Sequence, residues 1–158
     1  MKRNILLNFL LPIILLIPGV SFAEKGEKIL GVAGGYISTN NSGYAKLYFQ
    51  YSFSRHVRIA PDIDYVFKHN GKSAYGVNAD IHFPFRVSKG IHLYPLAGVG
   101  FSSWSVDGSD NVSRFGFNVG GGMDLYITSN LKVNVQGKYN LVHSMKGAYI
   151  DVGFGYVF

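Results

Sequence analysis

The sequence predicts an all-β protein, an eight-stranded antiparallel transmembrane up-and-down β-barrel. Three observations predict this fold. Apolar and polar residues alternate in eight separate segments, which is typical of strands with one apolar and one polar face. The composition combines 12 Phe, 11 Tyr and 20 Gly, without the spacing of an amphipathic helix. The N-terminus carries the features of an export signal.

The first residues of the chain are expected to be removed on export. Lys2 and Arg3 form a positive segment that precedes the apolar run 5–17, and Ser21 and Ala23 place small residues where a signal peptidase cleaves. A membrane anchor helix is the alternative, but the run is shorter than the roughly 20 residues that such a helix needs. The predicted division is a signal peptide at 1–23 and a barrel domain at 24–158.

The alternating segments have similar lengths. A segment of about 11 residues, rising about 3.3 Å per residue and tilted near 45°, crosses about 25 Å, the height of the apolar band of a membrane barrel. The segments lie near 28–38, 45–53, 57–67, 75–85, 91–101, 115–125, 131–141 and 150–158.

The direction of the apolar face decides between a membrane barrel and a soluble one. In segment 57–67, for example, Ile59 and Ile63 share one face, while Arg58 and Asp62 share the other. An eight-stranded barrel has an interior only just wide enough for side chains to fill. Five or six large apolar side chains per strand would overfill it, whereas the polar, glycine-rich face has the right volume. We therefore expect the apolar face to meet lipid.

The connections between the segments are expected to alternate in length. The short turns lie at 54–56, 86–90 and 127–130, and the longer loops at 39–43, 68–73, 102–113 and 142–147. This pattern predicts extracellular longer loops and a periplasmic N-terminus, in the outer membrane of a Gram-negative bacterium.

The longest connection, 102–113, holds Trp104, Asp107 and Asp110. The two aspartates leave a calcium site open as an alternative, but an ordinary solvated loop with an interfacial tryptophan is the favoured interpretation.

Three prolines fall inside alternating segments. Pro61, Pro84 and Pro95 each lack a backbone donor, and a closed barrel has no free edge on which to place them. We expect bulges or strand ends at these positions.

Glycine- and aromatic-rich stretches recur in the second half of the chain. They are Tyr94–Phe101, Phe115–Tyr126 with its glycine triplet, Asn130–Val133 and the terminal Gly153–Phe158. These stretches resemble the small outer-membrane β-barrel superfamily, which includes the transmembrane domain of outer-membrane protein A and the porin-family barrel domains. The resemblance covers essentially the whole mature chain and implies a barrel rather than a biochemical role. It also implies that Tyr156 and Phe158 form the signal that the barrel-assembly machinery recognises.

The polar inward face is the candidate site. With hairpin registers estimated from the turns, three pairs of opposite charge would face each other on neighbouring strands. The pairs are Lys46 with Asp64, Asp124 with Lys132, and Lys138 with Asp151. An unpaired charge in a narrow lumen would be costly, so we interpret the pairs as staples that fill the lumen. A gated ion path is the alternative.

The case for catalysis or a cofactor is weak. His82 and His92 could approach each other, but two histidines without a third ligand do not make a metal site. Lipid A deacylases of similar size use a His-x-Ser pair and a glutamate. Here His143 and Ser144 are adjacent, which places them on opposite faces, and no glutamate follows Glu27. We therefore predict no catalytic, cofactor-binding or metal-binding residues.

Composition narrows the function further. The formal net charge of +6 is mild and dispersed along the chain, so a nucleic-acid partner is not predicted. The chain has no cysteine, which excludes disulfides and a lipoprotein anchor. We predict a monomeric structural or surface-interaction protein without turnover, in contact with outer-membrane lipid, lipopolysaccharide and, during insertion, the barrel-assembly machinery. A narrow solute or ion channel is the alternative, and a lipid A-modifying enzyme is the least favoured.

Overall fold

The computed structural model describes residues 26–38, 41–141 and 147–158. The predicted signal peptide, His143 and Ser144 lie outside the described residues. The strands are β1 (Lys28–Ile37), β2 (Ser42–Ser52), β3 (Arg58–His69), β4 (Lys72–His82), β5 (Phe85–Ser88), β6 (Ile91–Val106), β7 (Val112–Tyr126), β8 (Leu131–Leu141) and β9 (Gly147–Val157). In this part of the chain, no helix is both long and apolar enough to span a membrane.

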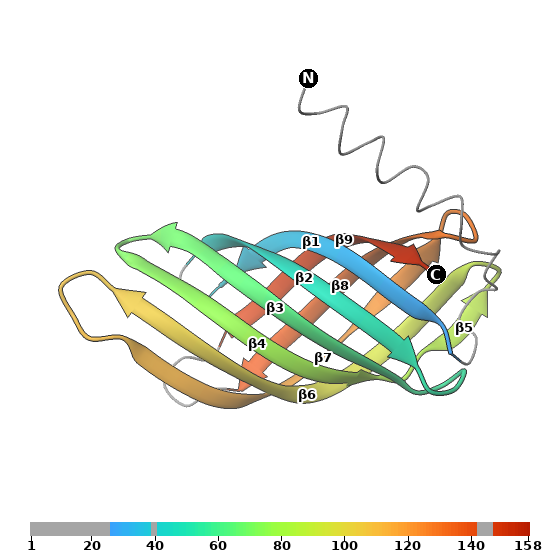
Figure 1. Cartoon of the computed structure of the whole chain (residues 1–158), viewed down its shortest axis with the longest axis horizontal. Helices are drawn as coiled ribbons and strands as arrows, with labels where there is room; N and C mark the ends of the chain where they lie inside the picture. Colours follow the sequence, from blue (N-terminus) through green and yellow to red (C-terminus); the bar gives the residue numbers. More distant parts are fainter. Residues whose placement is uncertain (1–25, 39–40, 142–146) are drawn as a thin grey trace, which may run out of the picture.

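The strands form one closed antiparallel barrel (Figure 1). Each strand pairs with its neighbour in the chain, except at two places. The first and last strands, β1 and β9, pair from Ile29 opposite Val157 onward. Both β4 and β5 pair with the same edge of β6, so they are two pieces of one interrupted strand. The barrel therefore has eight strand positions in up-and-down order, which confirms the predicted fold class.

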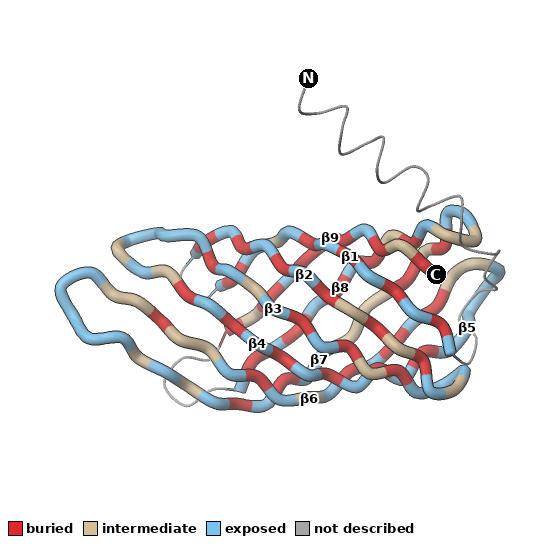
Figure 2. Tube along the Cα trace, in the orientation of Figure 1, coloured by how far each residue is buried: buried red, intermediate tan, exposed pale blue. Residues whose placement is uncertain are grey.

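Burial alternates along most of the long strands (Figure 2), and the large apolar side chains lie on the exposed face. Ile63 on this face is 55% exposed, whereas Asp124 and Lys132 on the other face are fully buried. This arrangement is the inverse of a soluble barrel, as the volume argument predicted. Inward glycines leave room for the large inward side chains: the Tyr94 ring lies against Gly122.

The three prolines are accommodated in two ways. Pro84 lies in the break between β4 and β5, as expected for a strand end. Pro95 lies in the middle of β6 and faces the same break, where its carbonyl accepts a hydrogen bond from the backbone N–H of Phe83 at 3.0 Å. Pro61 lies within β3, where pairing with β2 lapses and then resumes in the same register. The expectation of a bulge or strand end was therefore wrong for Pro61 and Pro95.

Two connections at the end of the barrel opposite the C-terminus are shorter than expected. β3 and β4 are joined by Asn70 and Gly71 alone, both with positive φ (52° and 74°), which is typical of a tight type I′ hairpin turn. β6 and β7 extend until only 107–111 connect them. The predicted loop residues are therefore largely strand, and the two hairpins project beyond the rest of the barrel (Figure 1).

The sequence predicted that Trp104 is an interfacial loop residue, and this prediction was wrong. Trp104 lies in β6, points inward and is 2% exposed. It packs in a buried cluster that closes this end of the interior, together with Ile37, Tyr44, Val66, Ala74 and Tyr149. The alternation simply continues through Ser102 and Ser103, whose small polar side chains had suggested a loop.

Two glycines on neighbouring strands give a matched test of the filled interior. A Cβ on Gly122 would clash with the Tyr94 ring and with the carbonyl of Val135, whereas a Cβ on Gly137 would meet nothing within 4 Å. We expect Gly122→Ala to lower the free energy of unfolding by about 1–3 kcal/mol, as overpacking does. Gly137→Ala should leave it nearly unchanged. Urea unfolding in lipid vesicles measures both, and an equal effect of the two substitutions would contradict the filled interior.

Candidate functional site

The interior is polar in its middle and apolar at both ends. One end is closed by the Trp104 cluster, and the other holds a second cluster of Ile29, Ala33, Tyr48, Tyr126 and Val157. Between them lie most of the buried charges, four cations and five carboxylates in all. The cations are Lys46, Arg58, Lys132 and Lys138, and the carboxylates are Glu27, Asp62, Asp80, Asp124 and Asp151. The near balance of opposite charges fits a lumen that excludes bulk water.

Arg58 is the centre of one network. Its guanidinium donates to Asp124 Oδ2 at 2.8 Å and lies 2.9 Å from His82 Nδ1. It also stacks over the Tyr94 ring, 4.9 Å from the ring centroid. Lys132 completes the network, since its Nζ lies 3.2 Å from Asp124 Oδ1. β3, β7 and β8 are thereby connected through the lumen.

Lys132 also reaches the far wall, because its Nζ donates to Gln50 Oε1 at 2.6 Å. Two tyrosines make similar neutral contacts: Tyr94 donates to Gln136 at 2.9 Å and Tyr48 to Asn134 at 3.0 Å.

Lys138 is the centre of a second network. Its Nζ lies 3.0 Å from Asp80 Oδ2 and 3.7 Å from Asp62 Oδ2. Asn78 donates to both Asp62 and Asp64, at 2.8 and 2.9 Å. The amide of Asn78 therefore holds together two carboxylates that would otherwise repel each other.

Asparagines extend this network, and a separate ion pair joins β2 to β9. Asn118 donates to Asp80 at 2.9 Å, and Asn140 donates to Asn118 at 2.8 Å. Lys46 forms an ion pair with Asp151 at 2.9 Å, and Tyr44 donates to the same carboxylate.

The predicted charge pairs are only partly brought together. Lys46 does lie opposite Asp64 in the ladder, but its ion pair is with Asp151. Asp124 and Lys132 do pair, although the register places Tyr126 opposite Lys132. For Lys46 the predicted ladder neighbour was correct and the ion pair was wrong. For Asp124 and Lys132 the predicted ion pair was correct and the ladder register was wrong.

The third predicted pair was wrong in register. Lys138 lies opposite Tyr149 and binds Asp80, while Asp151 lies opposite Gln136 and binds Lys46. Sequence reasoning also missed Arg58 as the centre of a network. All of these residues were assigned to the inward face correctly, but an inward side chain selects its partner across the lumen, which the strand pattern does not specify.

The two inward histidines do not form a joint site. His82 stacks on Tyr94 with ring centroids 4.4 Å apart, and His92 meets the Tyr126 ring edge-on at 5.4 Å. Among the described residues, no group of three or more His, Cys, Asp or Glu is placed to hold a metal ion.

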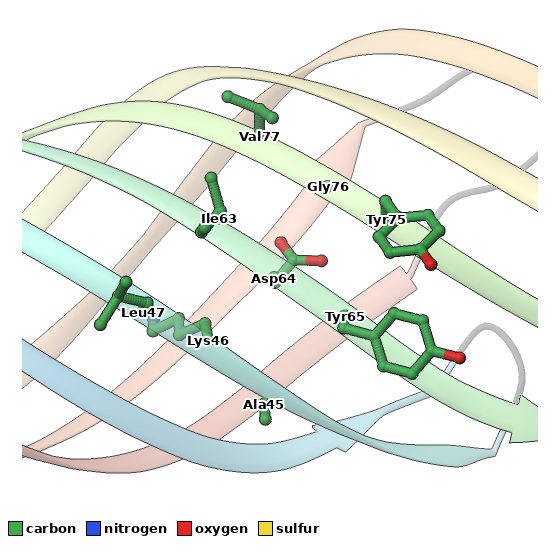
Figure 3. Close-up of a pocket in the computed structure, with 9 residues that line it drawn as sticks. All are labelled: Ala45, Lys46, Leu47, Ile63, Asp64, Tyr65, Tyr75, Gly76 and Val77. Atoms are coloured by element: carbon green, nitrogen blue, oxygen red, sulfur yellow. The ribbon is translucent and has the colours of Figure 1, made fainter.

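A hollow of about 540 Å³ lies against β2, β3 and β4 (Figure 3). Six of its nine lining residues are on the outward face, and Lys46, Asp64 and Gly76 complete the lining. The outward residues are Ala45, Leu47, Ile63, Tyr65, Tyr75 and Val77. It is therefore part of the lipid-facing wall and lacks the convergent polar groups that orient a substrate.

Tyr156 and Phe158, the residues predicted to form the assembly signal, lie at the end of β9 and just beyond it. Their rings stack with centroids 6.1 Å apart, and both are half-buried. Recognition by the assembly machinery stays a prediction for them.

Comparison with known proteins agrees with this architecture. The family model described as outer membrane protein beta-barrel domain matches residues 18–158. No curated protein sequence matches the chain.

Solved structures share the fold at low sequence identity. The N-terminal β-barrel domain of Pseudomonas aeruginosa OprF has a TM-score of 0.74 and 14% identity, covering 85% of this chain and 98% of that one. Neisserial surface protein A has a TM-score of 0.71 and 17% identity, covering 85% and 98%. A de novo designed transmembrane β-barrel has a TM-score of 0.65 and 18% identity, also covering 85% and 98%. A designed barrel shares the fold, so the fold alone carries no biochemical role.

The Arg58 network gives a test of interior pairing. Asp124→Asn removes the carboxylate shared by Arg58 and Lys132, and both cations stay buried. Leaving a buried charge without its partner costs about 3–5 kcal/mol, so the free energy of unfolding in lipid vesicles should fall by that order. The matched control is Asp107→Asn, which breaks an exposed ion pair with Lys68 and should have little effect. Equal effects of the two substitutions would show that the interior pair is solvated.

Proposed function

Because the chain belongs to the outer membrane protein beta-barrel domain family, we propose that it is a structural or surface-interaction protein of the Gram-negative outer membrane. Its lumen is closed by side chains, and it performs no catalytic turnover. The observation that carries this proposal is the pairing of buried charges across the lumen between two apolar clusters. An eight-stranded barrel is narrow enough to be closed in this way.

The six charged residues predicted from sequence act in this proposal as parts of a plug. Lys46, Lys132 and Lys138 each link two or more strands through a carboxylate or amide partner. Such links restrain the wall and occupy the path that an ion would need to take.

A narrow ion channel is the second candidate, and one observation favours it. Lys132 contacts both Asp124 on a neighbouring strand and Gln50 on the far wall. A cation with two partners can exchange between them, and such exchange could open a polar path through the middle of the lumen.

The proposed orientation places the C-terminus and the start of β1 in the periplasm. Support comes from the β3–β4 and β6–β7 hairpins, which project from the opposite end of the barrel (Figure 1). In this orientation the hairpins are extracellular and contact lipopolysaccharide, and Tyr156 and Phe158 face the side from which the assembly machinery inserts the barrel. The protein acts as a monomer in this proposal.

Planar-bilayer recording separates a closed lumen from a channel. We expect the refolded protein to give no steady conductance, because paired side chains fill its interior. A steady open channel would contradict the closed lumen. In that case Lys132→Met should change the ion selectivity of the current, whereas a leak around the barrel would not respond to this interior substitution.

Lipid A mass analysis tests the absence of turnover. Cells that express the protein should have the same lipid A mass profile as cells that do not, because the buried charges of the described interior form ion pairs with one another. His143→Ala provides the control: a profile that changes on expression and reverts with this substitution would establish a lipid A-modifying enzyme.

A further inference from the structure

The exposed charges of the described residues are divided unequally between the two ends of the barrel. Both exposed acidic side chains, Asp107 and Asp110, lie in the connection between β6 and β7. At the opposite end, the exposed charged side chains of the described residues are all cationic, whereas the Glu27 carboxylate is buried and accepts a hydrogen bond from Tyr126. These cations are Lys28, Arg55, Arg86 and Lys89, which we call the basic arc.

The basic arc follows consecutive strands along one side of the rim. Lys28 begins β1 opposite Tyr51 of β2, and Arg55 lies in the β2–β3 turn. The next residue of that turn, His56, lies within 3.4 Å of the carbonyl oxygen of Pro84, so the turn sits beside the break between β4 and β5.

Over β7 to β9, the described part of this rim carries no exposed charged side chain. Arg86 lies in β5 opposite His92 of β6, and Lys89 lies in the turn between β5 and β6. The turn between β7 and β8, residues 127–130, contains no charged side chain. The exposed cations of the described residues at this end therefore lie over β1 to β6, and none lies over β7 to β9.

Exposed apolar side chains lie directly beside these cations on the outer wall. They are Phe53, Phe83, Phe85 and Val87, and all four residues of β5 are exposed. A phospholipid has a matching arrangement at a membrane surface, because its acyl chains can contact the apolar side chains and its phosphate can contact the cations. Long cationic side chains at such a boundary keep their stems against apolar surface and their charged ends at the phosphates.

We propose that the basic arc binds the head groups of anionic phospholipids, with phosphatidylglycerol as the representative ligand. The proposal rests on the proposed function for its membrane setting, and it adds a lipid partner at the end of the barrel assigned to the periplasm. An acidic protein would match the cations, but it would leave the adjoining Phe53, Phe83 and Phe85 unexplained. A lipid accounts for both the charge and the apolar wall.

The test is lipid retention from vesicles that contain equal amounts of phosphatidylglycerol and phosphatidylcholine in both leaflets. Native mass spectrometry of the released protein counts the two lipids that stay bound. Each cation near an anionic surface contributes about 1 kcal/mol. The ratio of retained phosphatidylglycerol to retained phosphatidylcholine should therefore fall about fivefold for each cation removed. The variant Arg55→Gln/Arg86→Gln/Lys89→Gln should bring the ratio close to one, and high salt should lower it for the unmodified protein.

The matched control removes two cations from the other end of the barrel. Lys68→Gln/Lys72→Gln should leave the ratio unchanged, and heat-modifiable gel migration should show that both variants are folded. Equal retention of the two lipids by the unmodified protein would overturn the proposal. So would a triple variant that keeps the ratio, or a control that loses it equally.

Two further results distinguish this proposal from its alternatives. Equal lipid retention together with saturable binding of polyaspartate to the basic arc would assign the cations to an acidic protein instead. The retained-lipid ratio does not depend on conductance, so an open lumen would contradict the proposed function while leaving the lipid assignment intact.

Discussion

Backbone hydrogen bonding in a medium without water is the constraint on which this structure depends. A β-strand in hydrocarbon must pair both of its edges, because an unpaired N–H or C=O group finds no water there. Pairing of β1 with β9 and of β4 with β6 meets this requirement by closing the sheet. The constraint also explains the positions of two prolines. Pro84 lies in the break between β4 and β5, and Pro95 faces this break, so both residues without a backbone N–H lie at one interruption of the hydrogen-bond ladder.

Closure of only eight strands then sets the content of the interior. An eight-stranded barrel has an interior only just wide enough for side chains to fill, and most of the buried side chains between the two ends of this barrel are polar or charged. The protein resolves this by pairing charges across the lumen, as with Arg58 and Asp124, and by setting tyrosines against inward glycines, as with Tyr94 and Gly122. Apolar clusters then close the two ends. The inward face is thus a structural core built from polar groups, which is the basis of the closed-lumen proposal.

The alternation of residues was sufficient to predict the strands, their number and the direction of each face, because side chains on a strand point to opposite sides with a period of two. It was less reliable where the residues are small and polar. Ser102 and Ser103 resembled a loop, yet β6 continues through them and carries Trp104 into the interior. Most of the residues predicted to form long loops at 68–73 and 102–113 instead lengthen the strands of the β3–β4 and β6–β7 hairpins.

For the candidate site, too, the sequence predicted one part and the tertiary structure decided the other. The sequence by itself determined that Lys46, Asp124, Lys132, Lys138 and Asp151 face inward, since their position in the alternation leaves no other choice. Only the tertiary structure decided their partners, because two of the three predicted registers were displaced by two residues and because several ion pairs cross the lumen between strands that are not neighbours. Such contacts depend on the diameter and shear of the closed barrel, which are properties of all eight strands together and of no single segment.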